Sequence, residues 1–159
     1  MDAVVTEIRA EDHDRWVELW TSYLKFYKAS LPPETFDSTW QRLISKSGTL
    51  RGVGVRETDS GPLLGITHYL LHETAWTPKQ MCYMQDLFVD PSFRGNGLAR
   101  KLIEAVAKTA KDLDCYRCYW LTQDTNTQAR LLYDKLGRFN GFLRYDFDYT
   151  RPSLKQGIQ

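Results

Sequence analysis

The sequence predicts a mixed α/β fold in which one sheet carries helices on both faces. Two observations predict it: apolar segments in the first half are spaced as hairpins, and later ones alternate with segments of helical periodicity. With 159 residues, 42% of them hydrophobic and 13% aromatic, the chain can bury one core without disulfides or metal. We therefore expect a single domain over residues 1–150 and a flexible tail over residues 151–159.

The first half of the chain predicts strands and two amphipathic helices. Aromatic residues recur every three or four positions from Trp16 to Tyr27, a stripe that is usually core. Pro32 and Pro33 end this helix, and the turn sequence around Gly61 separates two strands of a hairpin. In chain order we expect a strand over residues 4–9, helices over 11–29 and 34–44, and strands over 51–57 and 63–71.

The second half alternates strands with helices. Residues 81–90 form a longer apolar segment, and Leu102, Val106 and Leu113 give the next segment a helical stripe. In chain order we expect a strand over residues 81–90, a helix from Leu98, a strand over 116–122, a helix after Asn126 and a last strand over 142–149.

A basic loop with two glycines joins the strand over residues 81–90 to its helix. Gly95 and Gly97 tolerate positive φ, so the backbone can turn several N–H groups toward one anion. The helix from Leu98 aims its free N–H groups and positive dipole end at the same spot, and Arg94 adds a cation. The loop therefore predicts a pyrophosphate site. A plain glycine turn beside a solvated arginine is the simpler alternative.

Two familiar phosphate motifs do not fit this loop. A Walker loop ends in Gly-Lys-Ser/Thr, whereas Gly97 is followed by Leu98 and Ala99. A dinucleotide fingerprint has a third glycine or alanine where Arg100 stands, and it follows the first strand of a chain. The loop therefore predicts a different class of pyrophosphate ligand.

The pattern Arg-x-x-Gly-x-Ala, from Arg94 through Gly97 to Ala99, resembles the coenzyme A signature of the GNAT (Gcn5-related) N-acetyltransferases. The resemblance covers most of the chain, and it implies a mostly antiparallel, twisted sheet that is splayed at the acetyl-CoA site, with acetyl-CoA as cosubstrate. It also implies two sets of cofactor-binding residues. The backbone of Leu87, Phe88 and Val89 would hold the pantetheine arm, and the pyrophosphate would rest on Arg94, Gly95, Asn96, Gly97, Leu98 and Ala99.

A downstream helix matches a second element of this family. Thr125 and Gln128 have the spacing of a capping box, and Gly137 closes the apolar stripe that follows. Asn126 and Tyr133 lie two turns apart on one helical face. By similarity, Asn126 would hydrogen-bond the coenzyme A arm and Tyr133 would protonate the departing thiolate. Taken alone, they are an ordinary first-turn residue and an ordinary core aromatic.

Further segments resemble the fungal HPA-type acetyltransferases, which are linked to histone tails, polyamines and D-amino acids. These segments are Leu19-Trp20-x-Ser22-Tyr23-x-x-Phe26-Tyr27, His72-x-Thr74-x-Trp76 and Tyr119-Trp120-x-Thr122. The polyamine acetyltransferases share an Asp86-x-Phe88-Val89 strand, but they carry an acid where this chain has Gln85.

Asp86 is the residue that we expect to act as general base, directly or through a water. An alkyl ammonium, with a pKa of about 10.4, must lose a proton before it can attack a thioester. Asp86 precedes the pantetheine-binding stretch, and an acid in an otherwise apolar strand needs a reason. Two alternatives remain: a hydrogen bond to structure, or neutralisation of a cationic substrate. His68 and His72 are interpreted as structural, although His72 could approach the acceptor.

Net charge and cysteine count limit which binding partners and which cellular compartment we expect. A formal net charge of +1 provides no global field to recruit nucleic acid or an anionic membrane. No apolar run has the length of a membrane span, and the acidic N-terminus does not resemble a signal peptide. Three cysteines fit a reducing compartment, so we expect a cytoplasmic protein. Cys115-x-x-Cys118 has no second pair, so no metal site is expected.

The function predicted by this resemblance is acetyl transfer from acetyl-CoA to a primary amine by direct attack in a ternary complex. The acceptor would be a polyamine, a histone-like lysine in a peptide, or an amino acid. An aminoglycoside-type N-acetyltransferase and a non-catalytic acyl-CoA sensor are the alternatives. The resemblance also implies a homodimer, since dimerisation is common in this group, and alternating aromatics over residues 142–149 would suit pairing of edge strands.

Overall fold

The computed structural model describes residues 1–149 of the chain. The tail expected over residues 151–159 lies outside the described residues. The chain divides into two compact units, Met1–Gln123 and Asp124–Gln159.

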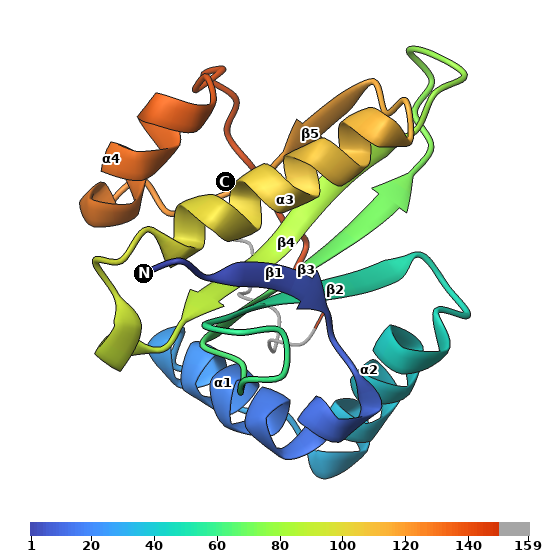
Figure 1. Cartoon of the computed structure of the whole chain (residues 1–159). Coiled ribbons are helices and arrows are strands. Elements are labelled where there is room, and N and C mark those ends of the chain that lie inside the picture. The colour runs from blue at the N-terminus through green and yellow to red at the C-terminus, as the bar shows by residue number, and fades with distance from the viewer. Residues whose placement is uncertain (150–159) are drawn as a thin grey trace, which may run out of the picture. The chain divides into compact units, whose positions relative to one another are not determined.

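A five-stranded sheet forms the centre of the first unit, and its strands lie in the order in which they occur along the chain (Figure 1). The strands are β1 (Val4–Glu7), β2 (Leu50–Arg56), β3 (Gly65–His72), β4 (Met81–Val89) and β5 (Arg117–Tyr119). The pairs from β1 to β4 are antiparallel, and β5 joins β4 in parallel. The predicted mixed, mostly antiparallel sheet is therefore confirmed.

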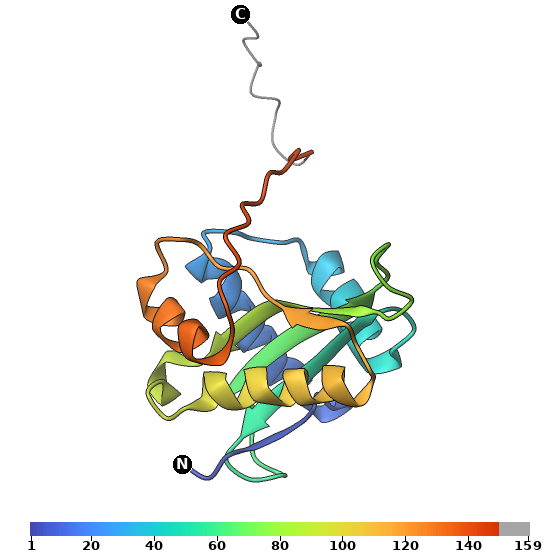
Figure 2. The same ribbon diagram turned by 90° about the horizontal axis from the view of Figure 1, so that it is seen from above.

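Helices cover both faces of this sheet, as Figures 1 and 2 show. α1 (His13–Phe26) and α2 (Pro33–Ser45) pack on one face, and α3 (Leu98–Asp112) packs on the other. Short 3-10 turns, η1 (Ala10–Asp12) and η2 (Pro91–Phe93), precede α1 and follow β4. No helix among residues 1–149 combines the length and apolar character that crossing a membrane requires.

The two faces of the sheet bury separate cores. Under α1 and α2 the buried side chains are Ile8, Trp16, Leu19, Trp20, Leu24, Leu43, Leu63, Ile66 and Phe88. Under α3 they are Ala3, Val55, Leu64, Val89, Leu98 and Leu102. In the predicted aromatic stripe of the first helix, Trp16 belongs to the core and is 0% exposed. Tyr27, at the end of the stripe, is 41% exposed.

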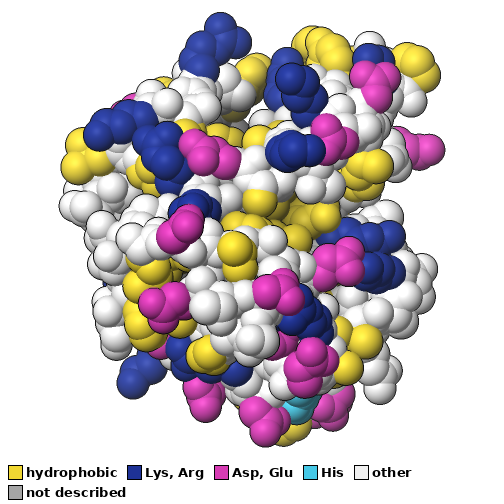
Figure 3. Space-filling view, in the orientation of Figure 1, with side chains coloured by type: hydrophobic (Ala, Val, Ile, Leu, Met, Phe, Trp, Pro, Cys, Tyr) yellow, Lys and Arg dark blue, Asp and Glu magenta, His cyan; other side chains and the backbone are white. Residues whose placement is uncertain are grey.

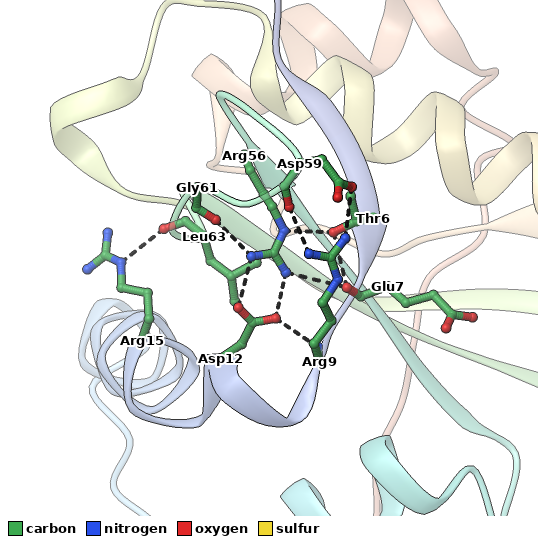
Figure 4. Close-up of polar contacts among 9 residues, drawn as sticks. All are labelled: Thr6, Glu7, Arg9, Asp12, Arg15, Arg56, Asp59, Gly61 and Leu63. Atoms are coloured by element: carbon green, nitrogen blue, oxygen red, sulfur yellow. Dashed lines mark hydrogen bonds and ion pairs between the residues drawn. The ribbon is translucent and has the colours of Figure 1, made fainter.

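A buried ion pair fixes the start of α1 to the sheet (Figure 4). The Arg56 guanidinium donates to both carboxylate oxygens of Asp12, with an Nη1–Oδ1 distance of 2.8 Å. Arg56 also donates to the Gly61 carbonyl at 2.9 Å, and the Arg9 backbone N–H donates to Asp12 Oδ2 at 2.7 Å. Burial raises the pKa of Asp12, but the bonds from Arg56 and Arg9 outweigh it and leave that pKa below its ordinary value.

Two predicted strands are corrected by the structure. Of the strand expected over residues 116–122, only β5 pairs with β4. Pairing stops there because β4 has an irregularity in its own pairing with β3 just beyond the last residue that pairs with β5. No strand forms within residues 142–149, although their aromatics alternate. A strand needs a neighbour for its backbone groups, and Tyr145 and Phe147 are 89% and 81% exposed in the described chain.

Candidate active site

A β-bulge in the middle of β4 determines which way Asp86 points. In the pairing with β3, Asp86 lies opposite His68 and Met84 lies opposite Tyr69, so Gln85 is the extra residue. Side chains alternate along a strand, and one inserted residue moves every later side chain to the other face. The bulge therefore places Asp86 on the face covered by α1, where His68 also lies.

The same bulge lies where the sheet opens. β5 pairs with β4 only as far as Tyr83, opposite Tyr119, whereas β4 continues to Val89. Leu87, Phe88 and Val89 pair with β3 along their other edge. Within residues 1–149, no strand pairs with the β5-side edge of this part of β4. This opening matches the splayed sheet that the family resemblance implied.

The glycine loop adopts the conformation that its residues predicted. Gly95 and Gly97 have φ of +82° and +75°, and no heavy atom lies within 4 Å of a Cβ built on either. Glycine is needed here for backbone conformation and not for space. Gly97 is the N-cap of α3, and Leu98 directly after it is 2% exposed. Leu98 therefore anchors the helix in the core and can offer a ligand only its backbone.

Arg94 and Asn96 hold the loop against the end of β4. Arg94 Nε donates to the Val89 carbonyl at 3.2 Å, and its Cζ lies 5.6 Å from the Phe88 ring centroid. Asn96 Nδ2 donates to the Phe93 carbonyl at 3.0 Å. Among residues 1–149, no partner is recorded for either Nη of Arg94, so its outer N–H groups can bind an anion beside the N-terminus of α3.

An ion pair ties α1 to the start of this loop. Arg15 Nη2 lies 2.6 Å from Asp90 Oδ2, and Arg15 Nε donates to the Leu63 carbonyl at 2.9 Å. The other carboxylate oxygen of Asp90 accepts the Ser92 backbone N–H at 2.9 Å. The hydrogen bonds from Arg15 and Ser92 hold the pKa of Asp90 below its ordinary value. The loop thus begins from a fixed, charged anchor.

Asp86 accepts hydrogen bonds on both carboxylate oxygens. Tyr23 OH donates to Oδ1 at 2.9 Å, and His68 Nδ1 lies 3.0 Å from Oδ2. Burial, followed by the charge of Asp86, raises the pKa of Tyr23, so its hydroxyl remains protonated and donates. The Asp86 side chain is 16% exposed. A carboxylate with this exposure can meet a substrate while the protein holds it in place.

Further aromatic side chains lie on the same face as Asp86. Tyr83 stacks on Tyr119 with ring centroids 4.9 Å apart, and the Tyr119 hydroxyl lies 2.8 Å from His72 Nε2. Cross-strand partners share a face, so the pairs Tyr83–Tyr119 and His68–Asp86 are on one side of the sheet. Trp76, in the loop between β3 and β4, is 83% exposed.

In the second unit, α4 (Thr127–Leu136) carries the remaining predicted site residues. Asn126 is the N-cap of α4, so the helix starts one residue later than the predicted capping box from Thr125 requires. Arg130 N–H donates to the Asn126 carbonyl at 3.1 Å, and Gly137 N–H donates to the Tyr133 carbonyl at 2.8 Å. The helix and its glycine end are confirmed. The predicted capping box does not form, because the N-cap makes no side-chain cap hydrogen bond.

The sequence missed two partners of the candidate base. Tyr23 was expected to be part of a core stripe and His68 to be structural, yet both bond the Asp86 carboxylate. Tyr23 and Asp86 are 63 positions apart in the chain. No spacing rule within one element connects them, because the contact exists only once α1 packs on the sheet.

Comparison with known proteins identifies the family. Residues 13–137 match the model of the acetyltransferase (GNAT) family. This chain belongs to the GNAT acetyltransferases. It is 38% identical over 133 residues to the D-amino-acid N-acetyltransferase HPA3 of Saccharomyces cerevisiae, a match that covers 84% of this chain and 83% of that protein. The thialysine N-epsilon-acetyltransferase of Sus scrofa is 36% identical over 70 residues, which are 44% of this chain and 40% of that protein.

Solved structures confirm the GNAT fold. The ribosomal-protein-alanine N-acetyltransferase from Brucella melitensis biovar Abortus 2308 gives a TM-score of 0.77 at 19% identity, covering 92% of this chain and 99% of that one. AAC(6')-Iy in complex with a bisubstrate analogue of coenzyme A gives 0.75 at 18% identity, covering 96% and 100%. As a GNAT N-acetyltransferase, this enzyme uses acetyl-CoA as the acetyl donor and an amine as the acceptor.

Proposed function

We propose that this GNAT enzyme acetylates the primary amine of a small cationic molecule by direct attack in a ternary complex, with Asp86 as the general base. The observation that carries the proposal is the position of Asp86. Its carboxylate is 16% exposed, is bonded by Tyr23 and His68, and lies at the bulge where β4 and β5 separate. A carboxylate in this position can take a proton from an ammonium group beside the cofactor-binding strand.

The cofactor-binding residues in this proposal are those of the open strand edge and the glycine loop. Backbone groups of Leu87, Phe88 and Val89 would bond the pantetheine arm along the edge that β5 does not cover. The pyrophosphate would bind to Arg94, to the N–H groups of Gly95, Asn96 and Gly97, and to the first turn of α3 at Leu98 and Ala99. Two left-handed glycines, a free guanidinium edge and a helix N-terminus support this assignment.

The chemical step follows from these groups. The acceptor ammonium gives a proton to Asp86, and the neutral amine nitrogen then attacks the thioester carbonyl carbon. An oxyanion forms, and backbone N–H groups beside the bulge are suited to stabilise it. When the C–S bond breaks, the thiolate leaves with the bonding electron pair and takes a proton from Tyr133. The nitrogen loses its second proton as the amide forms, and this proton passes through solvent to the Tyr133 phenolate. The roles of Tyr133 and Asn126 rest on their match to the family's second element.

The acceptor that we propose is an amino acid or a polyamine, with a lysine-containing peptide as the larger variant of the same chemistry. HPA3, identical over 38% of the aligned residues, is named a D-amino-acid N-acetyltransferase. The aromatic rings of Tyr23, Tyr83 and Tyr119 share the face of Asp86. Tyrosine rings together with a carboxylate favour an ammonium group.

Release of free coenzyme A thiol from acetyl-CoA tests this function. The acceptor panel contains D- and L-amino acids, thialysine, spermidine, spermine, a lysine-rich peptide and an aminoglycoside. Saturable release with an amino acid or a polyamine supports the proposal. If acetyl-CoA binds tightly and no amine gives release above background, the chain is an acyl-CoA sensor. Release with the aminoglycoside alone would replace the proposed acceptor class.

We also propose a cytoplasmic homodimer that binds neither nucleic acid nor membrane. Figure 3 shows Lys and Arg side chains interspersed with Asp and Glu over one face of the molecule, without a single-sign patch. Five large hydrophobic side chains between Phe142 and Tyr149 are at least 76% exposed. Their alternation suits a strand that forms only against a second copy of the chain.

A further inference from the structure

A chain of three hydrogen bonds runs from the core under α1 to the Asp86 carboxylate. Trp16 Nε1 donates to His68 Nε2 at 3.0 Å, His68 Nδ1 lies 3.0 Å from Asp86 Oδ2, and Tyr23 OH donates to Asp86 Oδ1 at 2.9 Å. Trp16 is 0% and His68 is 1% exposed. The chain therefore leads from a sealed core to the Asp86 carboxylate, whose side chain is 16% exposed.

The indole N–H of Trp16 determines which nitrogen of the His68 ring carries the proton. An indole N–H only donates, so Nε2 of His68 must accept and carries no proton. The ring proton is then on Nδ1, from which it points at Asp86 Oδ2. The bond from Trp16 therefore fixes one tautomer of the ring, with Nδ1 as the donor to Asp86.

The His68–Asp86 pair has neighbours on α1 and β2. From α1, Tyr23 bonds Asp86, the Tyr27 ring packs at a tilt against Tyr23 with ring centroids 5.0 Å apart, and Trp20 lies edge-on to His68 at 5.0 Å. From β2, Gly52 lies beside the His68 ring. Among residues 1–149, no lysine or arginine pairs with the Asp86 carboxylate. The ammonium group of the acceptor can therefore supply the positive charge that pairs with it.

We propose that His68 is the positioning residue for the base, and that Trp16 fixes His68 in the neutral tautomer that this role needs. This inference rests on the proposed function of Asp86. The N–H bond of the acceptor ammonium breaks and its proton binds Asp86 on the side that Tyr23 borders. The imidazole neither gains nor loses a proton. Oδ2 stays bonded to His68, so the carboxylate keeps one orientation through the step, and the proton later leaves to water.

Two substitutions of His68 separate this role from simple packing. His68→Asn puts an amide N–H near the position of Nδ1 and keeps a donor for Asp86. His68→Gln puts its amide near the position of Nε2 and leaves Oδ2 without a donor. We expect His68→Gln to lower kcat/KM for the amine by about 10- to 100-fold with unchanged acetyl-CoA affinity, and His68→Asn to restore most of that loss.

Trp16→Phe tests the tautomer. Without the indole donor, Nε2 of His68 can carry the ring proton, so ¹⁵N chemical shifts of the ring are expected to show a tautomer protonated at Nε2 that the wild type lacks. Equal losses of kcat/KM in His68→Asn and His68→Gln, in step with their melting temperatures, would overturn the positioning role. ¹⁵N chemical shifts of the His68 ring that are identical in Trp16→Phe and in the wild type would overturn the role of Trp16.

Failure of the proposed function is distinguishable from failure of this inference. If Asp86→Asn retains wild-type kcat/KM, both the base and its positioning residue are wrong, while thiol release still shows acetyl transfer. If the wild type releases no thiol, the tautomer is read directly from ¹⁵N chemical shifts of the His68 ring. A ring that carries its proton on Nδ1 supports the inferred tautomer, and a proton on Nε2 overturns it.

Discussion

Arg15 of α1 and Asp90 at the end of β4 form an ion pair in which Nη2 and Oδ2 are 2.6 Å apart. The pair connects the helix that carries Tyr23 to the first residue of the glycine loop. The side chains of Arg15 and Asp90 are 28% and 20% exposed, so solvent screens the pair only in part. The packing of α1 therefore positions both the candidate base and the candidate cofactor loop.

Arg15→Ala is expected to weaken acetyl-CoA binding by about 3- to 10-fold, because the loop loses its anchor at Asp90. Titration of acetyl-CoA by calorimetry measures the effect. Arg9→Ala is the matched control, since it also breaks an arginine–aspartate pair, with Asp59, outside the loop. Equal affinities in both variants would show that Arg15 does not position the loop.

Gly97→Ala is expected to weaken coenzyme A binding by about tenfold. Alanine at φ +75° costs roughly 1–2 kcal/mol, and 1.4 kcal/mol corresponds to a factor of ten. Gly48→Ala serves as the control, because a Cβ at Gly48 meets nothing within 4 Å and its φ is not in the left-handed region. Unchanged affinity in Gly97→Ala would contradict the role of the loop conformation.

Asp12→Asn and Arg56→Met are each expected to destabilise the fold by about 3–5 kcal/mol, since each leaves its buried partner uncompensated. Urea unfolding at pH 7 measures this free energy. Asp59→Asn, at an exposed pair in which Asp59 is 77% accessible, is expected to cost less than about 1 kcal/mol. A similar loss of unfolding free energy in all three variants would contradict the expectation that burial makes the Asp12–Arg56 pair important for stability.

The same pair predicts a pH dependence of stability. The pKa of Asp12 is lower in the folded state than in the unfolded chain, where it is about 3.9. Its contribution is therefore complete above that value and is lost as the pH falls through the folded-state pKa. We expect unfolding free energies to fall more steeply below about pH 4 in the wild type than in Asp12→Asn. Parallel slopes in the two proteins would argue against this contribution.

Tyr133→Phe is expected to lower kcat by about 100-fold while acetyl-CoA affinity stays unchanged, because only the departing thiolate loses its proton donor. Steady-state thiol release and equilibrium titration measure the two quantities separately. Tyr116→Phe, at a tyrosine that is 46% exposed outside the proposed site, is the control. Full turnover in Tyr133→Phe would remove Tyr133 from the mechanism.

The proposed dimer predicts that Tyr145→Lys combined with Phe147→Lys gives a monomer, because lysines on an edge strand oppose pairing. Light scattering across a concentration series measures the mass. Leu131→Lys, at an α4 position that is 62% exposed, changes an apolar side chain elsewhere and should leave the dimer intact. Wild-type protein that remains monomeric at every concentration would contradict the proposal.

Local patterns were sufficient for the helices, for the strands in the first half of the chain and for the glycine loop. Gly95 and Gly97 have the positive φ that their residue type suggested, and the helix after them starts at Leu98 as expected. The errors lie where a strand needs a partner. Aromatic residues alternate over residues 142–149 as they would in a strand. Alternation indicates which side chains share a face, but it does not indicate whether a neighbouring strand is present to pair with the backbone.

The sequence by itself determined the family, and it predicted the glycine loop as the cofactor site and Asp86 as the base, because each of these depends on residue types at short spacings. Only the tertiary structure decided where Asp86 points and what holds it. The bulge at Gln85 reverses the alternation of β4, and the packing of α1 brings Tyr23 and Trp16 to residues far along the chain. A bulge is defined by pairing between two strands, and a buried hydrogen bond by the approach of two elements. Neither leaves a periodic signal in one segment of sequence.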